Sequence, residues 1–152
     1  MATVSYKEGP FDSASGYGNT SPGSSSMPPG VKAAMIDCSI QGMAQNDILE
    51  ALSISAGSIV VEVGIAVLTA EDSTCKLDVG DGTTVDGFLD NVDAESAAGS
   101  VFNSLNAATG ADAYSGGKYY AADDTIDVKF LSGAANTFKG VIWCKFFKTN
   151  LN

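Results

Sequence analysis

Histidine and arginine are both absent from this chain of 152 residues. Without histidine, the chain lacks the usual general base, the usual partner of a nucleophilic serine and the commonest metal ligand in proteins. Without arginine, it lacks the side chain that makes bidentate contacts to phosphates and base edges. Its 8 basic residues are outnumbered by 18 acidic ones, which gives a net charge of −10. Nucleic acid is therefore not expected as a partner.

Cysteine is scarce, and the three residues present lie far apart without any CxxC spacing: Cys38, Cys75 and Cys144. A zinc site built from cysteine is therefore not expected. Cys38 and Cys144 alternate with apolar neighbours, as small buried side chains do in a strand. We expect buried, reduced cysteines rather than disulfides or a catalytic thiol, which fits assembly in a reducing cytoplasm.

Long apolar runs are also missing. The longest, residues 59–68, is interrupted by Glu62 and Gly64. It is well short of the ~18 apolar residues that a membrane-spanning helix needs. The N-terminal sequence MATVSYKEG has no basic segment followed by an apolar one, so a secretory signal is not expected either. Neither a membrane nor the secretory pathway is predicted for this chain.

The front of the chain is rich in glycine, serine and proline. From Gly9 to Gly30 it reads GPFDSASGYGNTSPGSSSMPPG, a composition that cannot form a continuous core element. We therefore predict two parts, an extended arm over residues 1–31 and a folded domain over residues 32–152. Phe11, Tyr17 and Met27 supply apolar anchors with which the arm would contact a partner, and free disorder is the alternative.

Behind the arm, apolar residues recur at every second position. The three clearest series are Ala34, Ile36, Cys38 and Ile40; Ile59, Val61, Val63, Ile65 and Val67; and Ile126, Val128 and Phe130. This alternation, with turn residues between the series, is typical of half-buried antiparallel strands. It predicts an all-β fold, an antiparallel β-sandwich of jelly-roll-like form, rather than a βαβ fold.

Two segments carry mixed signals. Residues 47–54, DILEALSI, fit a helical turn or a strand, and we interpret them as a strand. Residues 94–105 place apolar side chains at helical spacing, but Gly99 and Ser100 weaken a helix there. We interpret this second segment as a mixture of structures.

The last predicted strand, residues 138–147, is apolar on both faces. Ile142 and Cys144 lie on one face, whereas Val141, Trp143 and Phe147 lie on the other. Because one face of a strand in a two-layer sandwich meets the core, the second face is either covered within the chain or pressed against another chain. We predict that Val141, Trp143 and Phe147 form a subunit interface of a homo-oligomer, a trimer or a dimer; burial within the chain is the alternative.

The segment Leu77 to Asp90, LDVGDGTTVDGFLD, joins a short apolar alternation to a cluster of aspartates and glycines. An EF-hand needs oxygen ligands at its third and fifth positions, where a loop starting at Asp78 has only glycine. A calcium site of another kind, built from Asp81, Asp86, Asp90 and Asp93, stays open as an alternative. We favour a strand followed by turns whose aspartates cap backbone amides, without a cofactor or metal.

Neither glycosidase chemistry nor another enzymatic activity is marked by any motif in this chain. No pair of acids is singled out as the two carboxylates that glycoside hydrolysis requires. Tyr114, Tyr119 and Tyr120 would suit a shallow glycan-binding surface, although tyrosines are also ordinary at the edge of a sandwich.

Four blocks of the sequence resemble small structural proteins of tailed bacteriophages, in particular virion proteins of podoviruses that infect marine bacteria. In chain order they are SAGSIVVEVGIAVLTAED, LDVGDGTTVDGFLD, GGKYYAADDTIDVKF and GVIWCKFFK. The resemblance spans residues 46–148 and does not include the arm. It implies a non-enzymatic virion protein of capsid-decoration or cement type, of the kind that is commonly a β-sandwich.

The resemblance also implies a place and a partner. Decoration proteins sit on the outer surface of the shell and hold neighbouring major capsid protein subunits together, after assembly in the host cytoplasm. A β-sandwich on the tail or virion surface that recognises a host glycan is the alternative that this resemblance leaves open.

Overall fold

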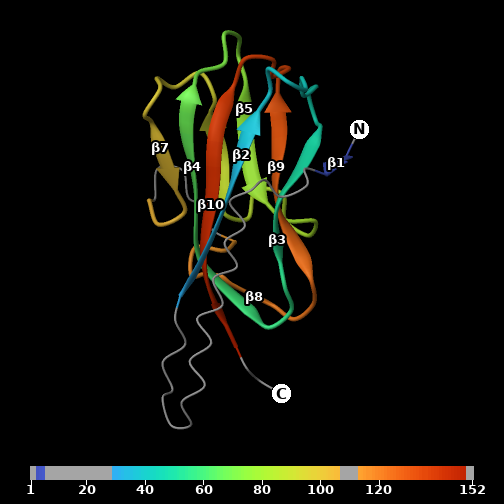
Figure 1. Cartoon of the computed structure of the whole chain (residues 1–152), viewed down its shortest axis with the longest axis vertical. Coiled ribbons are helices and arrows are strands. Elements are labelled where there is room, and N and C mark those ends of the chain that lie inside the picture. Colours follow the sequence, from blue (N-terminus) through green and yellow to red (C-terminus); the bar gives the residue numbers. More distant parts are fainter. Residues whose placement is uncertain (1–2, 6–28, 107–112, 150–152) are drawn as a thin grey trace.

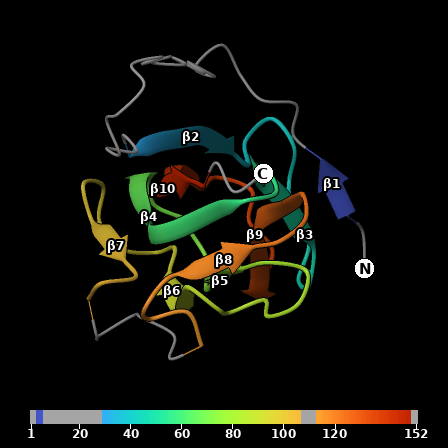
Figure 2. The same ribbon diagram turned by 90° about the horizontal axis from the view of Figure 1, so that it is seen from below.

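The structure is a computed structural model that describes residues 3–5, 29–106 and 113–149. Every regular element in these ranges is a β-strand, and the strands form two facing sheets (Figures 1 and 2). One sheet has the order β1-β3-β9-β5-β6, and the other has the order β2-β10-β4-β7 with β8 paired to β4. The bounds are β1 Thr3–Ser5, β2 Gly30–Asp37, β3 Ile48–Ile54, β4 Ser58–Thr69, β5 Lys76–Gly80, β6 Leu89–Asp93, β7 Val101–Asn103, β8 Lys118–Tyr120, β9 Asp124–Ser132 and β10 Lys139–Lys148.

The strand pairing is that of a long hairpin rolled up on itself. β2 pairs with β10, β3 with β9, β4 with β7 and β5 with β6, all antiparallel. Successive members of this series alternate between the two sheets, which is the arrangement of a double-sheet jelly roll. The predicted antiparallel β-sandwich is therefore confirmed.

Alternation along the strands builds the core between the sheets. Inward residues of β4 and β10, such as Val63, Ile65 and Ile142, are completely buried. They face Val128 and Phe130 of β9 in the other sheet, which are equally buried. Because each strand has a period of two, the same sequences send every second side chain to an outer face of the sandwich.

The segment from Leu77 forms a strand and then a tight turn, as predicted. β5 ends at Gly80, and the carboxylate of Asp81 accepts hydrogen bonds from the backbone amides of Thr83 and Thr84, both at 2.9 Å. The turn then folds over the outer face of its own sheet, where a Cβ atom on Gly80 would overlap the Thr84 carbonyl. Glycine is therefore required where the loop crosses its own strand.

The two ambiguous segments resolve into strand and turns. Residues 47–54 contain β3, so the strand interpretation is confirmed. Residues 94–105 contain only the short strand β7, and Gly99 has a φ of 92° in the turn before it. The local break at Gly99 outweighs the helical spacing of the apolar side chains, because helix formation cannot proceed through it at low cost.

The N-terminal part of the chain contributes to both sheets. β1, Thr3–Ser5, lies parallel to β3 at one sheet edge, and β2 begins at Gly30. Both strands fall at least partly within residues 1–31, which the sequence assigns to the arm. In the part of the chain that the structure describes, no helix is long and apolar enough to cross a membrane.

Candidate functional site

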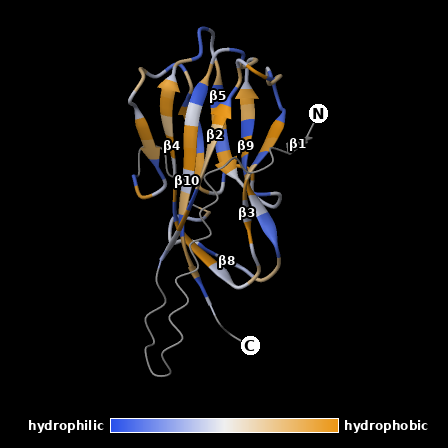
Figure 3. Cartoon of the chain, in the orientation of Figure 1, coloured by the Kyte–Doolittle hydropathy of each residue, from blue (hydrophilic) through white to orange (hydrophobic). Residues whose placement is uncertain are grey.

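The two outer faces of the sandwich differ in chemistry. Seven large apolar side chains are exposed in the described residues, and all lie on β8 or on, or shortly after, strands of the β2-β10-β4-β7 sheet. They are Val31, Met35, Ile40, Leu68, Val101, Leu105 and Tyr119. Figure 3 shows hydrophobic stretches along β4, β7 and β10 of this sheet.

Strand register places these side chains in rows across the sheet. Met35 of β2 pairs with Val141 of β10, which pairs with Ala66 of β4, which in turn pairs with Val101 of β7. Paired residues of an antiparallel sheet point to the same side, so the four form one outward row. With the outward residues beside them they form what we call the apolar face: Val31, Ala33, Met35, Ala66, Leu68, Val101, Val141 and Trp143.

Trp143 lies in the middle of the apolar face. Its indole ring covers Gly64 of β4, and a Cβ atom at that position would overlap the ring. Phe147 points to the same side further along β10, because it is four residues beyond Trp143 on a strand. The structure thus brings Val141, Trp143 and Phe147 onto one outward side, all half-buried. Their role in a subunit interface stays a prediction.

Ion pairs mark both ends of the apolar face. Lys145 of β10 lies 2.5 Å from Glu62 of β4, whose carboxylate also accepts a hydrogen bond from Asn103 of β7. At the other end, Lys139 lies 3.0 Å from Asp37 of β2. The Lys145 hydrogen bond holds the pKa of Glu62 below its usual value, so that Glu62 is ionised at neutral pH. The outward charges of this face therefore cancel in pairs.

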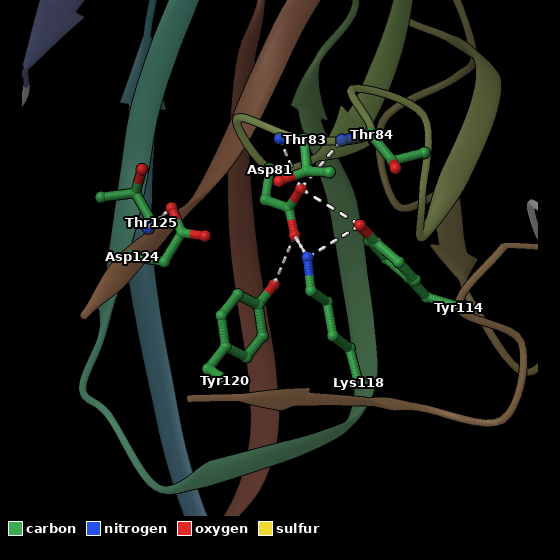
Figure 4. Close-up of polar contacts among 8 residues, drawn as sticks. All are labelled: Asp81, Thr83, Thr84, Tyr114, Lys118, Tyr120, Asp124 and Thr125. Atoms are coloured by element: carbon green, nitrogen blue, oxygen red, sulfur yellow. Dashed lines mark hydrogen bonds and ion pairs between the residues drawn. The ribbon is translucent and has the colours of Figure 1, made fainter. Parts of the chain in front are cut away.

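A buried carboxylate joins the two sheets at the end of the sandwich near β8 (Figure 4). Asp81 directly follows β5 of one sheet, whereas Lys118 and Tyr120 belong to β8, which is paired with the other sheet. The Lys118 ammonium and the Tyr120 hydroxyl both donate to Oδ2 of Asp81, the hydroxyl at 3.1 Å. The Tyr114 hydroxyl donates to Oδ1 at 3.2 Å. We call these four residues the Asp81 cluster.

Aromatic rings enclose the ammonium of this cluster. Lys118 Nζ lies 4.3 Å from the ring centre of Tyr114 and 4.8 Å from that of Tyr120, within the range of cation–π attraction. Burial alone would raise the pKa of Asp81, but the hydrogen bonds from Lys118 and from the turn amides hold it below its usual value. Burial and the Asp81 charge raise the pKa of Tyr120, which stays protonated as a donor. The cluster is a closed set of donors around one acceptor.

The aspartates proposed as an alternative calcium site do not share one environment. Asp81 belongs to the buried cluster, Asp93 lies 3.0 Å from Lys76, and Asp90 is exposed and bonded to its neighbour Asn91. Among the described residues, no three acidic or cysteine side chains are grouped so that they would hold a metal ion. A cation at Asp81 would have to displace the Lys118 ammonium.

We therefore expect calcium to leave the thermal stability of the protein unchanged. The Tm measured by differential scanning fluorimetry should be the same with calcium in millimolar amounts as with EDTA. A rise of several degrees with calcium that disappears in the double variant Asp81→Asn, Asp86→Asn would contradict this expectation.

The tyrosines considered for a glycan surface are not brought together as exposed rings. Tyr120 is buried, and the Tyr114 hydroxyl is engaged by Asp81 and Lys118. Tyr119 points away from its neighbour Tyr120 and is 52% exposed. The described residues therefore offer one exposed tyrosine of the three, which does not make a stacking platform for a sugar.

The outer face of the other sheet carries buried charge instead of exposed apolar groups. Asp127 of β9 pairs with Glu50 of β3 and with Gly80 of β5, where the turn after β5 folds over the sheet. Oδ1 of Asp127 has no hydrogen-bond partner, and burial, with the charges of Glu50 and Asp124 nearby, raises its pKa to about 6 in spite of an opposing hydrogen bond from Thr125.

The remaining predicted residues divide into two groups. The cysteines are all buried and unpaired, as expected, and burial raises the pKa of Cys38 to about 12 and that of Cys75 and Cys144 to about 11. Such thiols are inert at neutral pH. The arm anchors Phe11, Tyr17 and Met27 lie outside the described residues.

Comparison with solved structures places this fold among capsid proteins. A chain of the "Capsid of Ralstonia phage GP4" matches with a TM-score of 0.64 at 16% identity, over 98% of this chain and 99% of that one. A chain of the "Cyanophage Pam1 capsid asymmetric unit" matches with a TM-score of 0.54 at 12% identity, over 92% and 99%. This chain shares its fold with proteins of phage capsids.

A third chain, from the "Acidic stable capsid structure of Helicobacter pylori bacteriophage KHP30", matches with a TM-score of 0.51 at 18% identity, over 78% of this chain and 86% of that one. The three matches cover 86–99% of the matched chains, so each of those chains is similar in length to this one. No protein-family model and no curated protein matches the sequence.

The sequence identified several residues of the apolar face and of the Asp81 cluster but not the residues that contact them in the fold. Alternation along residues 138–147 identified Trp143 and Val141, but Met35 and Val101 join them only through strand register. The Asp81 cluster joins residues 37 positions apart in the chain. A lone lysine between tyrosines, as in the sequence YSGGKYY, is the one local signal that would have pointed to a buried ion pair.

Proposed function

We propose that this chain is a structural protein of a phage virion that decorates the outer surface of the capsid. The observation that carries the proposal is the match of this jelly roll to chains of three phage capsids, over 86–99% of those chains. The role of this chain would be structural rather than catalytic.

The mechanism would be mechanical attachment to the major capsid protein. A sandwich seated on the shell, together with the part of the arm between β1 and β2 if it reaches over neighbouring subunits, would make several weak contacts at once. Contacts that are linked in this way bind far more tightly together than each does alone, because the second contact is intramolecular once the first has formed. In this proposal Phe11, Tyr17 and Met27 of the arm are the apolar anchors on the capsid surface.

The arm is tested in the full-length chain with a triple variant. Recombinant protein is added to capsids assembled without it, and bound copies are counted by densitometry of purified particles. We expect Phe11→Ala, Tyr17→Ala, Met27→Ala to lower occupancy at least tenfold at limiting protein. The matched control, Ser24→Ala, Ser25→Ala, Ser26→Ala, changes the same segment without removing apolar groups and should bind as the natural chain does. Equal occupancy for both triple variants would refute the role of the arm.

A further inference from the structure

The apolar face is a surface that the chain itself leaves open. Val31, Met35 and Val101 are 57%, 56% and 58% exposed, although each is flanked by other apolar groups of the same sheet. Single exposed apolar residues are ordinary, but a contiguous patch spread over four strands marks an interaction site. The opposite outer face, where Glu50, Asp127 and Lys129 point outward, offers no comparable patch within the described residues.

The charge distribution on this face allows a second copy of the chain to bind there. The protein carries a net charge of −10, so two copies repel each other at most relative orientations. On the apolar face the outward charges are two lysines and two acids, arranged as the pairs Lys145–Glu62 and Lys139–Asp37 at opposite ends. A second copy can approach this face without net repulsion, and because each end presents both signs, a lysine of one copy can meet an acid of the other.

The size of the face suits a contact between two copies. Three strands ~8 residues long at ~3.3 Å per residue, with the short strand β7 beside them and a spacing of ~4.8 Å, give a projected area on the order of 400 Å². The accessible area is larger than the projection because side chains stand out from the sheet. It therefore approaches the ~600–1,000 Å² per partner of a specific protein–protein interface. Trp143 in the middle and polar groups at the ends also match the usual anatomy of such an interface.

We infer that the apolar face of the β2-β10-β4-β7 sheet is the surface through which copies of this chain associate with one another. The apolar rows of one copy pack against those of the next, and Trp143 lies at the centre of the contact. This inference rests on the surface of the chain and does not require the proposed role on the capsid.

Two measurements on the full-length protein test the inference. The first is the mass in solution, by analytical ultracentrifugation over a wide concentration range. The natural chain should form a dimer or trimer, and Met35→Lys should weaken association at least tenfold, because a lysine side chain on each copy would be driven into the contact. The matched control is Ile40→Lys, which changes a side chain that is 79% exposed but lies in the turn beyond the face. It should associate as the natural chain does.

The second measurement uses the single tryptophan of the chain, Trp143, as a reporter. Its emission should shift to shorter wavelength as the protein concentration rises, because association removes water from the indole. Met35→Lys should abolish the shift without changing the circular dichroism spectrum.

A natural chain that stays monomeric at all concentrations, or a Met35→Lys variant that associates like Ile40→Lys, would overturn the inference. A monomeric natural chain whose binding to capsids is lost in Met35→Lys would do so while supporting the proposed function, since the face would then belong to the capsid contact. Self-association without any capsid binding would support the inference and contradict the proposed function.

Discussion

Replacing Asp81 with alanine is expected to destabilise the protein by about 3–5 kcal/mol, the typical cost of breaking a buried ion pair by removing one partner. The variant would leave the Lys118 ammonium, two tyrosine hydroxyls and two backbone amides without their common acceptor. For a domain of this size the Tm should fall by about 10–20 °C. Thermal unfolding followed by circular dichroism measures the change.

The matched control for this prediction is Asp90→Ala. Asp90 belongs to the same acidic segment but is exposed, and its carboxylate accepts one hydrogen bond from the neighbouring Asn91 side chain. Its loss should change the stability by at most about 0.5 kcal/mol. In the double variant Asp81→Leu, Lys118→Met, part of the lost stability should return, because neither a buried charge nor its partner remains. Equal Tm values for Asp81→Ala and Asp90→Ala would show that the Asp81 cluster does not hold the two sheets together.

Replacing Asp127 with asparagine is expected to stabilise the protein at pH 8 and to leave it unchanged at pH 3.5. Burial raises the pKa of this carboxyl from 3.8 to about 6, so the folded state holds the proton more tightly than the unfolded chain does. Below pH 3.8 the carboxyl is mostly protonated in both states, and it has little effect on stability. As the pH rises to 6 the unfolded chain ionises first, and stability is lost until the folded state ionises too.

The size of this effect follows from the same two values. A difference between 3.8 and about 6 corresponds to roughly 3 kcal/mol at ~1.36 kcal/mol per pKa unit. Asparagine has the shape of the protonated carboxyl and cannot ionise, so Asp127→Asn should recover much of this loss at pH 8. Denaturant unfolding at both pH values measures it, with the exposed Asp90→Asn as the control that should gain nothing. A destabilised Asp127→Asn at pH 8 would mean that an unseen partner stabilises the ionised carboxylate.

Much of the fold could be predicted because the alternation of apolar residues along a strand indicates which of its side chains are buried. Residues 126–130 alternate strictly, and the alternation placed their inward side chains correctly. In residues 59–67 it placed Val63, Ile65 and Val67 correctly, but an irregularity in the pairing with β10 puts Val60 in the core instead of Ile59 and Val61. The double-faced pattern of residues 138–147 likewise predicted an apolar outer side for this strand, which the structure places in the interior of its sheet as β10, between β2 and β4. These signals are local, so a single sequence carries them.

What could not be predicted depends on pairing between distant residues. Alternation shows that Met35 points to one side of its strand but does not show that Val141, Ala66 and Val101 continue its row. Similarly, an aspartate in a Gly-rich turn is typical of a cap, and its second role, bonding to Lys118 across the sandwich, arises only when the chain closes. Register and sheet packing decide both features, and neither has a signature within one segment.

The central claim, that this protein decorates a capsid, is tested most directly by an electron cryomicroscopy reconstruction of the virion that carries it. We predict density for the β-sandwich on the outer surface of the shell, in regular copies, each in contact with the major capsid protein. Absence of the sandwich from the shell, or its presence in the tail instead, would contradict the claim.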